Sequence, residues 1–177
     1  MSVPVAHVDA KSASVGVKLF GQASDIADRW SNPKAIADRN RLLRLIRAHQ
    51  REFPQQRVVL LGGDIHVGCL FRIDWADAVT SFHQFTSSAL SNLQPRFAEW
   101  GAEQVPKALA GIDKSEELEA SVAIVPSAEA HGRNPYGGLN LGIVEVRTEP
   151  KTELRFKLVG SPAPDGNPRI AYDSGWI

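Results

Sequence analysis

Several features that would restrict the class of this protein are missing from its sequence. Cys69 is the single cysteine, so the chain cannot form a disulfide within itself. No apolar run approaches the roughly 18 residues that a membrane-spanning helix needs. Neither sign of charge is in excess, because 20 Lys and Arg residues balance 20 Asp and Glu residues. Composition therefore gives no reason to expect a nucleic acid or an anionic membrane as a partner.

The N-terminal sequence MSVPVAHVDA also lacks the basic segment followed by an apolar one that marks a signal peptide. We therefore expect a cytoplasmic protein, although a truncated start would hide an export signal. Of the 177 residues, 43% are hydrophobic and 23% are charged, which is typical of an ordinary folded domain. We find no internal repeat, so a single domain, 1–177, is expected.

The sequence predicts a long helix at 33–53. Pro33 suits the first helical turn, and Ser31 or Asn32 can cap it. One helical face is apolar, since its residues follow each other at spacings of seven, three and seven: Ile36, Leu43, Ile46 and Phe53. The helix is expected to end at Pro54.

A continuous apolar run at 58–61 follows this helix and is ended by Gly62 and Gly63. Such a run is typical of a strand covered on both faces, so it is predicted to be the central strand of a sheet. A helix packed beside strands indicates an α/β fold, in which ligands bind beyond the carboxyl ends of the strands.

Further strands are predicted at 70–75, 81–87, 141–146 and 154–159, the last two joined by a turn at 149–152. The segment 93–118 has a mixed helical pattern that Pro106 and Gly111 interrupt. We expect the region 93–135 to be either a packed helical insertion or a lid. The fold class is therefore α/β, a mixed sheet with flanking helices.

Asp64 and His66 carry the clearest chemical signal, because they follow the apolar strand in the motif GDIHVG. Residues two apart in extended backbone project to the same side, so a carboxylate and an imidazole converge. Carboxylate oxygen suits hard cations and neutral imidazole suits Zn, Fe, Mn or Co, so the pair fits a dinuclear hydrolytic centre. The alternative is that Asp64 bonds nearby backbone N–H groups and that His66 is an ordinary, partly buried histidine.

The motif RVVLLGGDIHVG, followed by FHQFTSSALSN, resembles the C-terminal signature of alkaline phosphatase D-like (PhoD-like) enzymes. These enzymes belong to the calcineurin-like metallophosphoesterase superfamily. Upstream, DRWSNPKAIADRNRLLRLI resembles the Asp-x-Trp element and the Arg-containing helix of that family. The resemblance covers about 2–92 and is strongest at 57–92. It departs from the family at Ser31, where Asp is frequent, and at Asp38, where Glu is usual.

The resemblance implies the C-terminal half of a calcineurin-like sandwich and a phosphomonoesterase or phosphodiesterase that uses metal-bound hydroxide. It makes Asp64 and His66 ligands of two adjacent metal ions, divalent or trivalent, with Fe, Mn, Zn and Ca all open. It also makes His7 a ligand from an earlier strand, although a histidine at a strand end is more often only solvated. Substrate-binding residues remain unknown.

The family's other ligands belong to an N-terminal half that has no counterpart before His7. We therefore expect this chain alone to be inactive or to bind metal weakly. It would be a fragment or one piece of a split enzyme, with a sheet face left bare for a homodimer or the missing half. The alternative is a non-catalytic α/β remnant that acts as a binding or scaffold module. A nucleotide-binding fold is set aside, because no Gly-x-Gly-x-x-Gly opens a helix.

For most of the other candidate residues, a structural role is favoured over a functional one. The basic stripe Arg44, Arg47 and Arg51 is expected to be a solvated helix face. Ser87 and Ser88 lack the His–Asp pair of a catalytic triad, and Cys69 is expected to be a small buried hydrophobe. His83 and Gln84 could reach a pocket mouth or lie on a wet strand face. A loop that contains His131, Arg133 and Asn134 could close over substrate.

Overall fold

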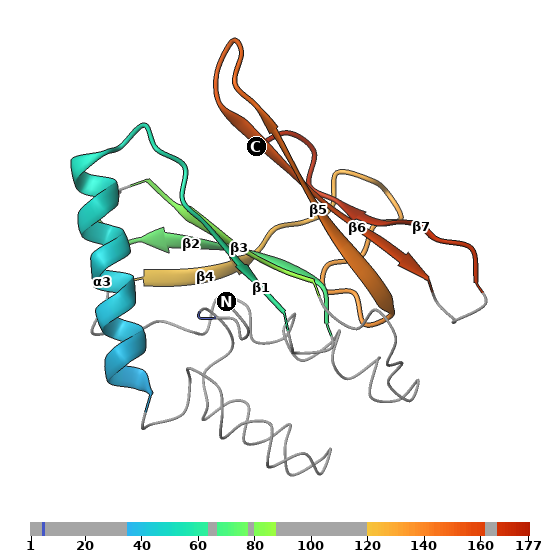
Figure 1. Ribbon diagram of the computed structural model, residues 1–177, viewed down its shortest axis with the longest axis horizontal. Helices are drawn as coiled ribbons and strands as arrows, with labels where there is room; N and C mark the ends of the chain where they lie inside the picture. The colour runs from blue at the N-terminus through green and yellow to red at the C-terminus, as the bar shows by residue number, and fades with distance from the viewer. Residues whose placement is uncertain (1–4, 6–34, 64–66, 78–79, 88–119, 162–165) are drawn as a thin grey trace.

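The computed structural model describes residues 5, 35–63, 67–77, 80–87, 120–161 and 166–177. This part of the chain contains one helix and seven strands, arranged as two sheets with the helix on one side (Figure 1). The predicted α/β class is confirmed at this level, since the structure is a mixed, mostly β sandwich-like fold. No helix in the described ranges is both long and apolar enough to cross a membrane.

The helix α3 (Ile36–Glu52) confirms the predicted helix. Leu43 and Ile46 are buried, as their spacing indicated, while Phe53 is 40% exposed. The start differs from the prediction, because Ala35 is the N-cap and provides no side-chain bond. The predicted capping residues 31–32 lie outside the described residues.

The first sheet has the order β1-β3-β2-β4, and we call it sheet A. Its strands are β1 (Val59–Gly62), β2 (Cys69–Trp75), β3 (Phe82–Thr86) and β4 (Ala120–Ile124). β1 is parallel to β3, whereas β2 is antiparallel to both β3 and β4.

β1 is the first strand of sheet A within the described structure, so the prediction that it is the central strand is not confirmed there and stays a prediction. Leu61 is 52% exposed there. An apolar run shows that a strand has hydrophobic contacts, but it does not specify how many strands flank it. β3 takes an inner position despite its polar residues, and all five of its residues are buried.

The strand β4 corrects one part of the predicted lid or helical insertion at 93–135. All five residues 120–124 pair with β2, from Phe71↔Ile124 to Trp75↔Ala120. This portion is therefore built into sheet A. The preceding residues 93–119 lie outside the described residues.

The second sheet, sheet C, is antiparallel and has the order β5-β6-β7. Its strands are β5 (Leu139–Arg147), β6 (Glu153–Ser161) and β7 (Arg169–Asp173). β5 and β6 form the predicted hairpin, since Arg147 pairs with Glu153 across the turn. β7 was not among the predicted strands.

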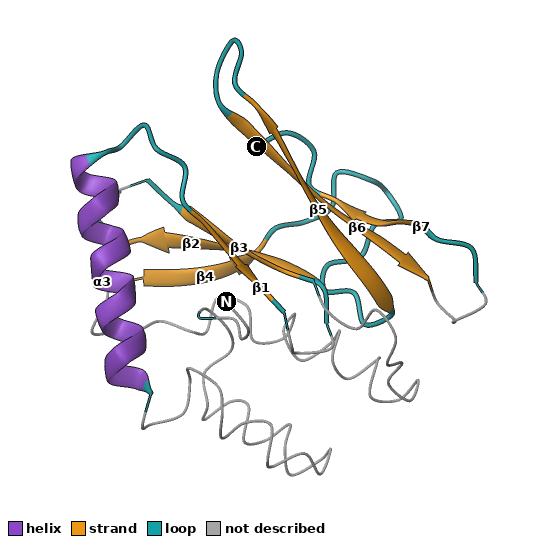
Figure 2. Ribbon diagram, viewed as in Figure 1, coloured by secondary structure: helices purple, strands orange, loops and turns teal. Residues whose placement is uncertain are grey.

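Sheet A lies between α3 and sheet C, so the described structure has three layers (Figure 2). The residues of β2 alternate between the two sides: Phe71 and Ile73 join the core with the helix, and Leu70 joins the core with sheet C. The expected bare face is therefore not on sheet A, because sheet C covers the face opposite the helix. Periodicity can show that one face of a strand is apolar, but it does not identify the element that covers this face. A bare face could therefore not be inferred from it.

Candidate functional site

The carboxyl ends of β1 and β3 lie next to each other on the border of sheet A that is formed by strand ends. We call this border the carboxyl edge. The two strands are parallel, with Gly62 directly opposite Thr86. The backbone N–H of Ser87 donates to the carbonyl oxygen of Gly62 at 3.1 Å, which extends the pairing one residue past the end of β3. Asp64 follows Gly63 in the sequence, so the motif GDIHVG continues from this edge. In open α/β sheets this is where ligands bind.

Thr86 is the unusual residue at this edge. It is fully buried, and its hydroxyl oxygen has no hydrogen-bond partner among the described residues. A buried polar group without a partner costs free energy, so native proteins rarely keep one without a reason. Because alternate residues share a sheet face, Thr86 lies on the same face as Gln84 and Phe82, which is the face that packs against α3.

Ser87 connects the same edge to sheet C. Its hydroxyl donates to Oδ1 of Asn140 at 3.2 Å. Asn140 lies on β5, is 2% exposed, and donates through Nδ2 to the carbonyl oxygen of Gly138 at 2.8 Å. Three strand ends from two sheets therefore meet here, joined by hydrogen bonds between neutral oxygen and nitrogen atoms.

Glycine at two positions allows sheet C to approach this closely. A Cβ atom on Gly142 would lie 2.7 Å from a ring carbon of Phe85 and 2.7 Å from Cβ of Ser87. A Cβ atom on Gly68 would lie 2.6 Å from Leu158 and 2.9 Å from Oδ1 of Asn140. Larger residues would push β5 away from the carboxyl ends of β1 and β3.

The predicted metal ligands Asp64, His66 and His7 lie outside the described residues, so their role stays a prediction. The residues that flank the motif are described. Val67, which directly follows His66 in the sequence, is buried at 6% exposure. Within the described ranges, no three His, Cys, Asp or Glu side chains gather as a metal site would require.

His83 and Gln84 do not lie on a wet strand face or at a pocket mouth. Both are buried, at 7% and 1% exposure, and they point to opposite faces of sheet A. Gln84 accepts a hydrogen bond from the backbone of Val5 at 2.7 Å. His83 lies against Phe156 with ring centroids 5.9 Å apart. The pattern was misleading because polar strand residues are stable inside a core when the fold supplies partners.

Burial has a strong effect on His83. It lowers the pKa of the imidazole to about 4, with the positive charges of Arg57 and Arg72 acting in the same direction and Asp74 opposing them. The neutral form is therefore favoured in the folded protein.

The loop predicted as a cover for substrate is held in place at Asn134. Its Nδ2 donates to the carbonyl oxygens of Leu70 at 2.8 Å and Val125 at 2.7 Å, and its Oδ1 accepts from the N–H of Leu70 at 3.1 Å. Tyr136 forms a two-bond bridge with Gly68. Asn134 thus joins the loop to β2 and β4, which is a structural role.

Structural contacts also account for Arg47, Arg51 and Cys69. Arg47 and Arg51 both pair with Asp77, and Arg47 lies 5.6 Å from the ring centroid of Trp75, so this part of the stripe is more than a solvated face. These guanidinium groups lower the pKa of Asp77 to about 2. Cys69 is 1% exposed and burial raises its thiol pKa, which confirms it as a buried hydrophobe.

Sequence reasoning missed Thr86 and Asn140. The serines after β3 were considered only as nucleophiles, and the resemblance drew attention to FTSSALSN without separating Thr86 from its neighbours. Nothing in the pattern around Asn140 indicates that it reaches the end of β3, because that contact depends on how the two sheets stack.

No family model matches this chain, and neither a curated protein nor a solved structure matches it.

Proposed function

We propose that this chain carries part of the metal site of a phosphoesterase of the alkaline phosphatase D-like family, within a calcineurin-like sandwich. The observation that supports the proposal most is the position of GDIHVG, which follows β1 at the edge where the parallel strand β3 also ends. The two sheets and the outer helix are compatible with such a sandwich.

The surroundings of this edge can position a carboxylate that follows β1. Thr86 supplies a buried hydroxyl that lacks a partner among the described residues, and a carboxylate would be a natural acceptor for it. In the proposal, Thr86 donates to the carboxylate of Asp64 and orients it, as groups behind a metal ligand commonly do. Ser87 and Asn140 hold the adjacent strand ends together.

Asp64 and His66 would each hold one of two metal ions, with Fe, Mn, Zn and Ca all open. When bound, the metal pair would lower the pKa of a water molecule and neutralise charge that develops on the phosphate ester. Two protein ligands are too few for such a centre, so further ligands are required. His7 is one candidate, and a second chain is another source.

The experiment measures metal content together with hydrolysis of an aryl phosphate and a bis-aryl phosphate. The purified chain is loaded with Mn, Zn, Fe or Ca and compared with Asp64→Ala and His66→Ala. We expect each substitution to lower metal occupancy and any turnover by at least about 100-fold, since even residues behind the ligands cost 10- to 100-fold. His131→Ala is the matched control, because His131 is exposed in a loop after β4.

The outcomes separate the two functions considered from sequence. Metal that is lost only in the Asp64 and His66 variants supports the phosphoesterase site, and turnover would show that the centre is complete in the purified protein. Stoichiometric metal binding without turnover supports an incomplete centre. If the wild-type chain binds no metal above the level of the two variants, the proposal fails and the non-catalytic binding module becomes the better description.

A further inference from the structure

β5 is the edge strand of sheet C, and no other described strand pairs with its outer side. The direction of its backbone groups follows from β6. Leu154 exchanges both backbone hydrogen bonds with Ile177, on the side away from β5. Its partner on β5, Val146, therefore directs its own N–H and C=O away from β6, and alternation gives the same direction to Val144 and Gly142.

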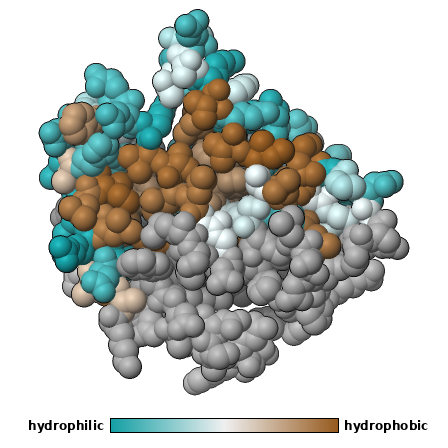
Figure 3. Space-filling view, in the orientation of Figure 1, coloured by the Kyte–Doolittle hydropathy of each residue, from teal (hydrophilic) through white to brown (hydrophobic). Residues whose placement is uncertain are grey.

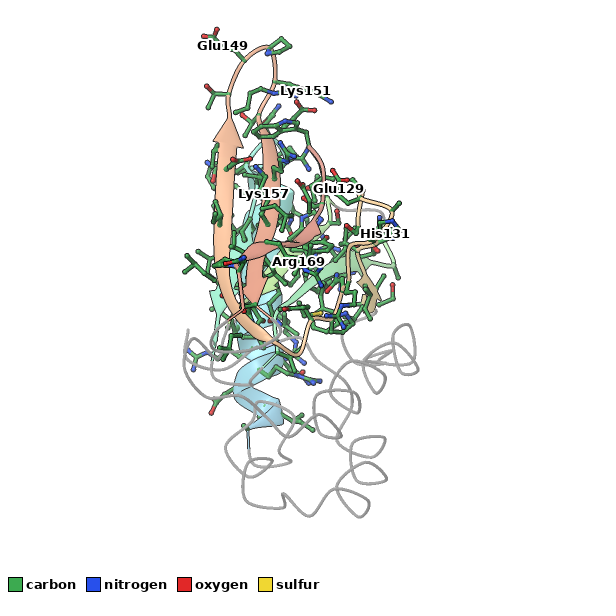
Figure 4. All side chains as sticks on the ribbon, turned by 90° about the vertical axis from the view of Figure 1, so that its right-hand side faces the viewer. Glu129, His131, Glu149, Lys151, Lys157 and Arg169 are labelled. Atoms are coloured by element: carbon green, nitrogen blue, oxygen red, sulfur yellow. The ribbon has the colours of Figure 1, made fainter. Side chains whose placement is uncertain are left out.

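This edge has little of the usual protection against pairing with another strand, since its charged residues, Glu145 and Arg147, both lie in its last third. β5 is nine residues long and contains no proline. Val146 is 62% exposed, Leu141 52% and Ile143 37%. Figure 4 shows β5 as one border of sheet C, with β6 beside it. Figure 3 shows hydrophobic residues gathered on the face where the edges of the two sheets lie. Long apolar edges of this kind tend to pair with further strands.

We propose that two copies of this chain form a homodimer through antiparallel pairing of β5 with β5 of the second copy. The pairing joins the two three-stranded sheets into one continuous sheet. A two-fold axis passes through Val144, so that Val144 lies opposite Val144 of the second copy. This register uses the outward N–H and C=O groups of Gly142, Val144 and Val146 from both copies.

The side chains favour this register. Gly142 lies opposite Val146 of the second copy, so the exposed valine meets a position that has no side chain. On the other face, Leu141 lies opposite Arg147 of the second copy, whose aliphatic stem can cover the leucine. The equal numbers of acidic and basic residues leave no net charge to keep two copies apart. The same complementarity makes a second copy a better occupant than an unrelated strand.

The first test measures the mass of the full chain in solution by sedimentation at several concentrations. We expect a dimer in the wild type. Leu141→Lys would place a positive charge opposite Arg147 of the second copy and raise the dimer Kd by about tenfold or more, because each dimer contains this pair twice. Leu141→Glu removes the same apolar surface but places an opposite charge there, so it should retain the dimer.

Leu45→Lys is the control for a general effect of surface lysine, since Leu45 is 61% exposed on α3. A wild-type chain that remains monomeric up to about 100 μM would overturn the proposal, because specific homodimers are generally tighter than this. Equal effects of Leu141→Lys and Leu141→Glu would also overturn it, since charge at this position would then face no charged partner.

The second test determines the register without disturbing the hydrogen bonds. Leu141→Cys and Arg147→Cys proteins are prepared separately, mixed and oxidised. In the proposed register the two thiols face each other across copies, so the mixture should give a disulfide-linked dimer and neither protein alone should. Cys69 is 1% exposed and does not compete. A mixture of Leu141→Cys with Leu45→Cys is the control, and equal crosslinking there would contradict the register.

This dimer does not depend on the proposed phosphoesterase activity. Sedimentation and crosslinking report on β5 alone, whereas metal binding reports on Asp64 and His66. Failure of either proposal is therefore distinguishable from failure of the other.

Discussion

The two faces of sheet A are covered in different ways. The face against α3 includes polar side chains in its core, since Gln50, Gln84 and Thr86 are all at most 1% exposed. The face against sheet C is dominated by aromatic and aliphatic residues, with Phe85 and Phe156 5.2 Å apart and glycines that allow the sheets to approach closely.

The difference between the two faces of sheet A bears on the stability of the fold and on the candidate site. The interface between the sheets buries an apolar cluster, which stabilises the fold, together with the polar residues His83 and Asn140. The helix face must supply partners for its polar groups, and Thr86 has none among the described residues. Both faces therefore bury apolar clusters that stabilise the fold, and we assign the unsatisfied group to the candidate site.

The largest expected effect comes from Phe156→Ala at the sandwich interface. Phe156 is 0% exposed and contacts both Phe85 and His83, so the substitution leaves a cavity between the sheets. We expect the free energy of unfolding to fall by about 3–5 kcal/mol. Urea unfolding followed by circular dichroism measures it. A loss below about 1 kcal/mol would show that the two sheets contribute little to each other.

The next effect is a pH dependence that originates at His83, on the sandwich face. Its pKa is about 4 in the folded protein and about 6.5 when unfolded, so the unfolded chain binds more protons between these values. Stability should therefore fall as pH decreases from about 6.5 to about 4, by up to about 3 kcal/mol.

The measurement compares urea unfolding at pH 7, 5.5 and 4.5 for the wild type and His83→Phe. The difference between the two proteins isolates His83 from the other histidines and from the carboxylates. Parallel pH curves would show that His83 is not neutralised by burial, and the contrast between the two faces would weaken.

On the helix face, Gln50→Leu tests whether the polar groups there are satisfied by one another. Gln50 accepts a hydrogen bond from Nε1 of Trp75 at 2.8 Å and donates to the carbonyl oxygen of Ser81 at 3.1 Å. The substitution leaves both without this partner, so we expect a loss of about 1–3 kcal/mol. Combined with Trp75→Phe in a double-mutant cycle, the two losses should not be additive. Additive losses would contradict the network.

The smallest effect is expected for Thr86→Val, which removes the unpaired hydroxyl and keeps the shape. Stability should stay unchanged or rise by about 1 kcal/mol, because no hydrogen bond within the described structure is lost. Thr86→Ser, which keeps the hydroxyl, is the control. A loss of more than about 1 kcal/mol would show that the hydroxyl donates to a partner outside the described residues, as it does to Asp64 in the phosphoesterase proposal. If the phosphoesterase proposal holds, Thr86→Val should also weaken metal binding by about tenfold.

The local elements were predictable because their signals lie in adjacent residues. The spacing of Leu43 and Ile46 indicated the buried face of α3, and Pro54 marked its end. Alternation along 141–146 and 154–159 indicated the hairpin of β5 and β6. β4 was not predicted, since ASVAI is short and follows a segment of mixed helical pattern.

The candidate site was predictable only in part. GDIHVG could be recognised as a chemical motif from its residue types and its position after an apolar strand. The surroundings could not, because Thr86 and Asn140 reach this edge through the pairing of β1 with β3 and the stacking of the sheets. The burial of His83 and Gln84, which were expected at a pocket mouth or on a wet strand face, was not predictable for the same reason.

The sequence by itself determined the helix α3 and five of the seven described strands, and it located Asp64 and His66 after a strand, because periodicity and turn residues act over a few positions. Only the tertiary structure decided the strand order β1-β3-β2-β4 of the described part of sheet A, the position of β5 at the border of the described part of sheet C, and the burial of His83 and Thr86. These features depend on contacts between residues far apart in the chain, and short-range patterns carry no information about which distant partners meet.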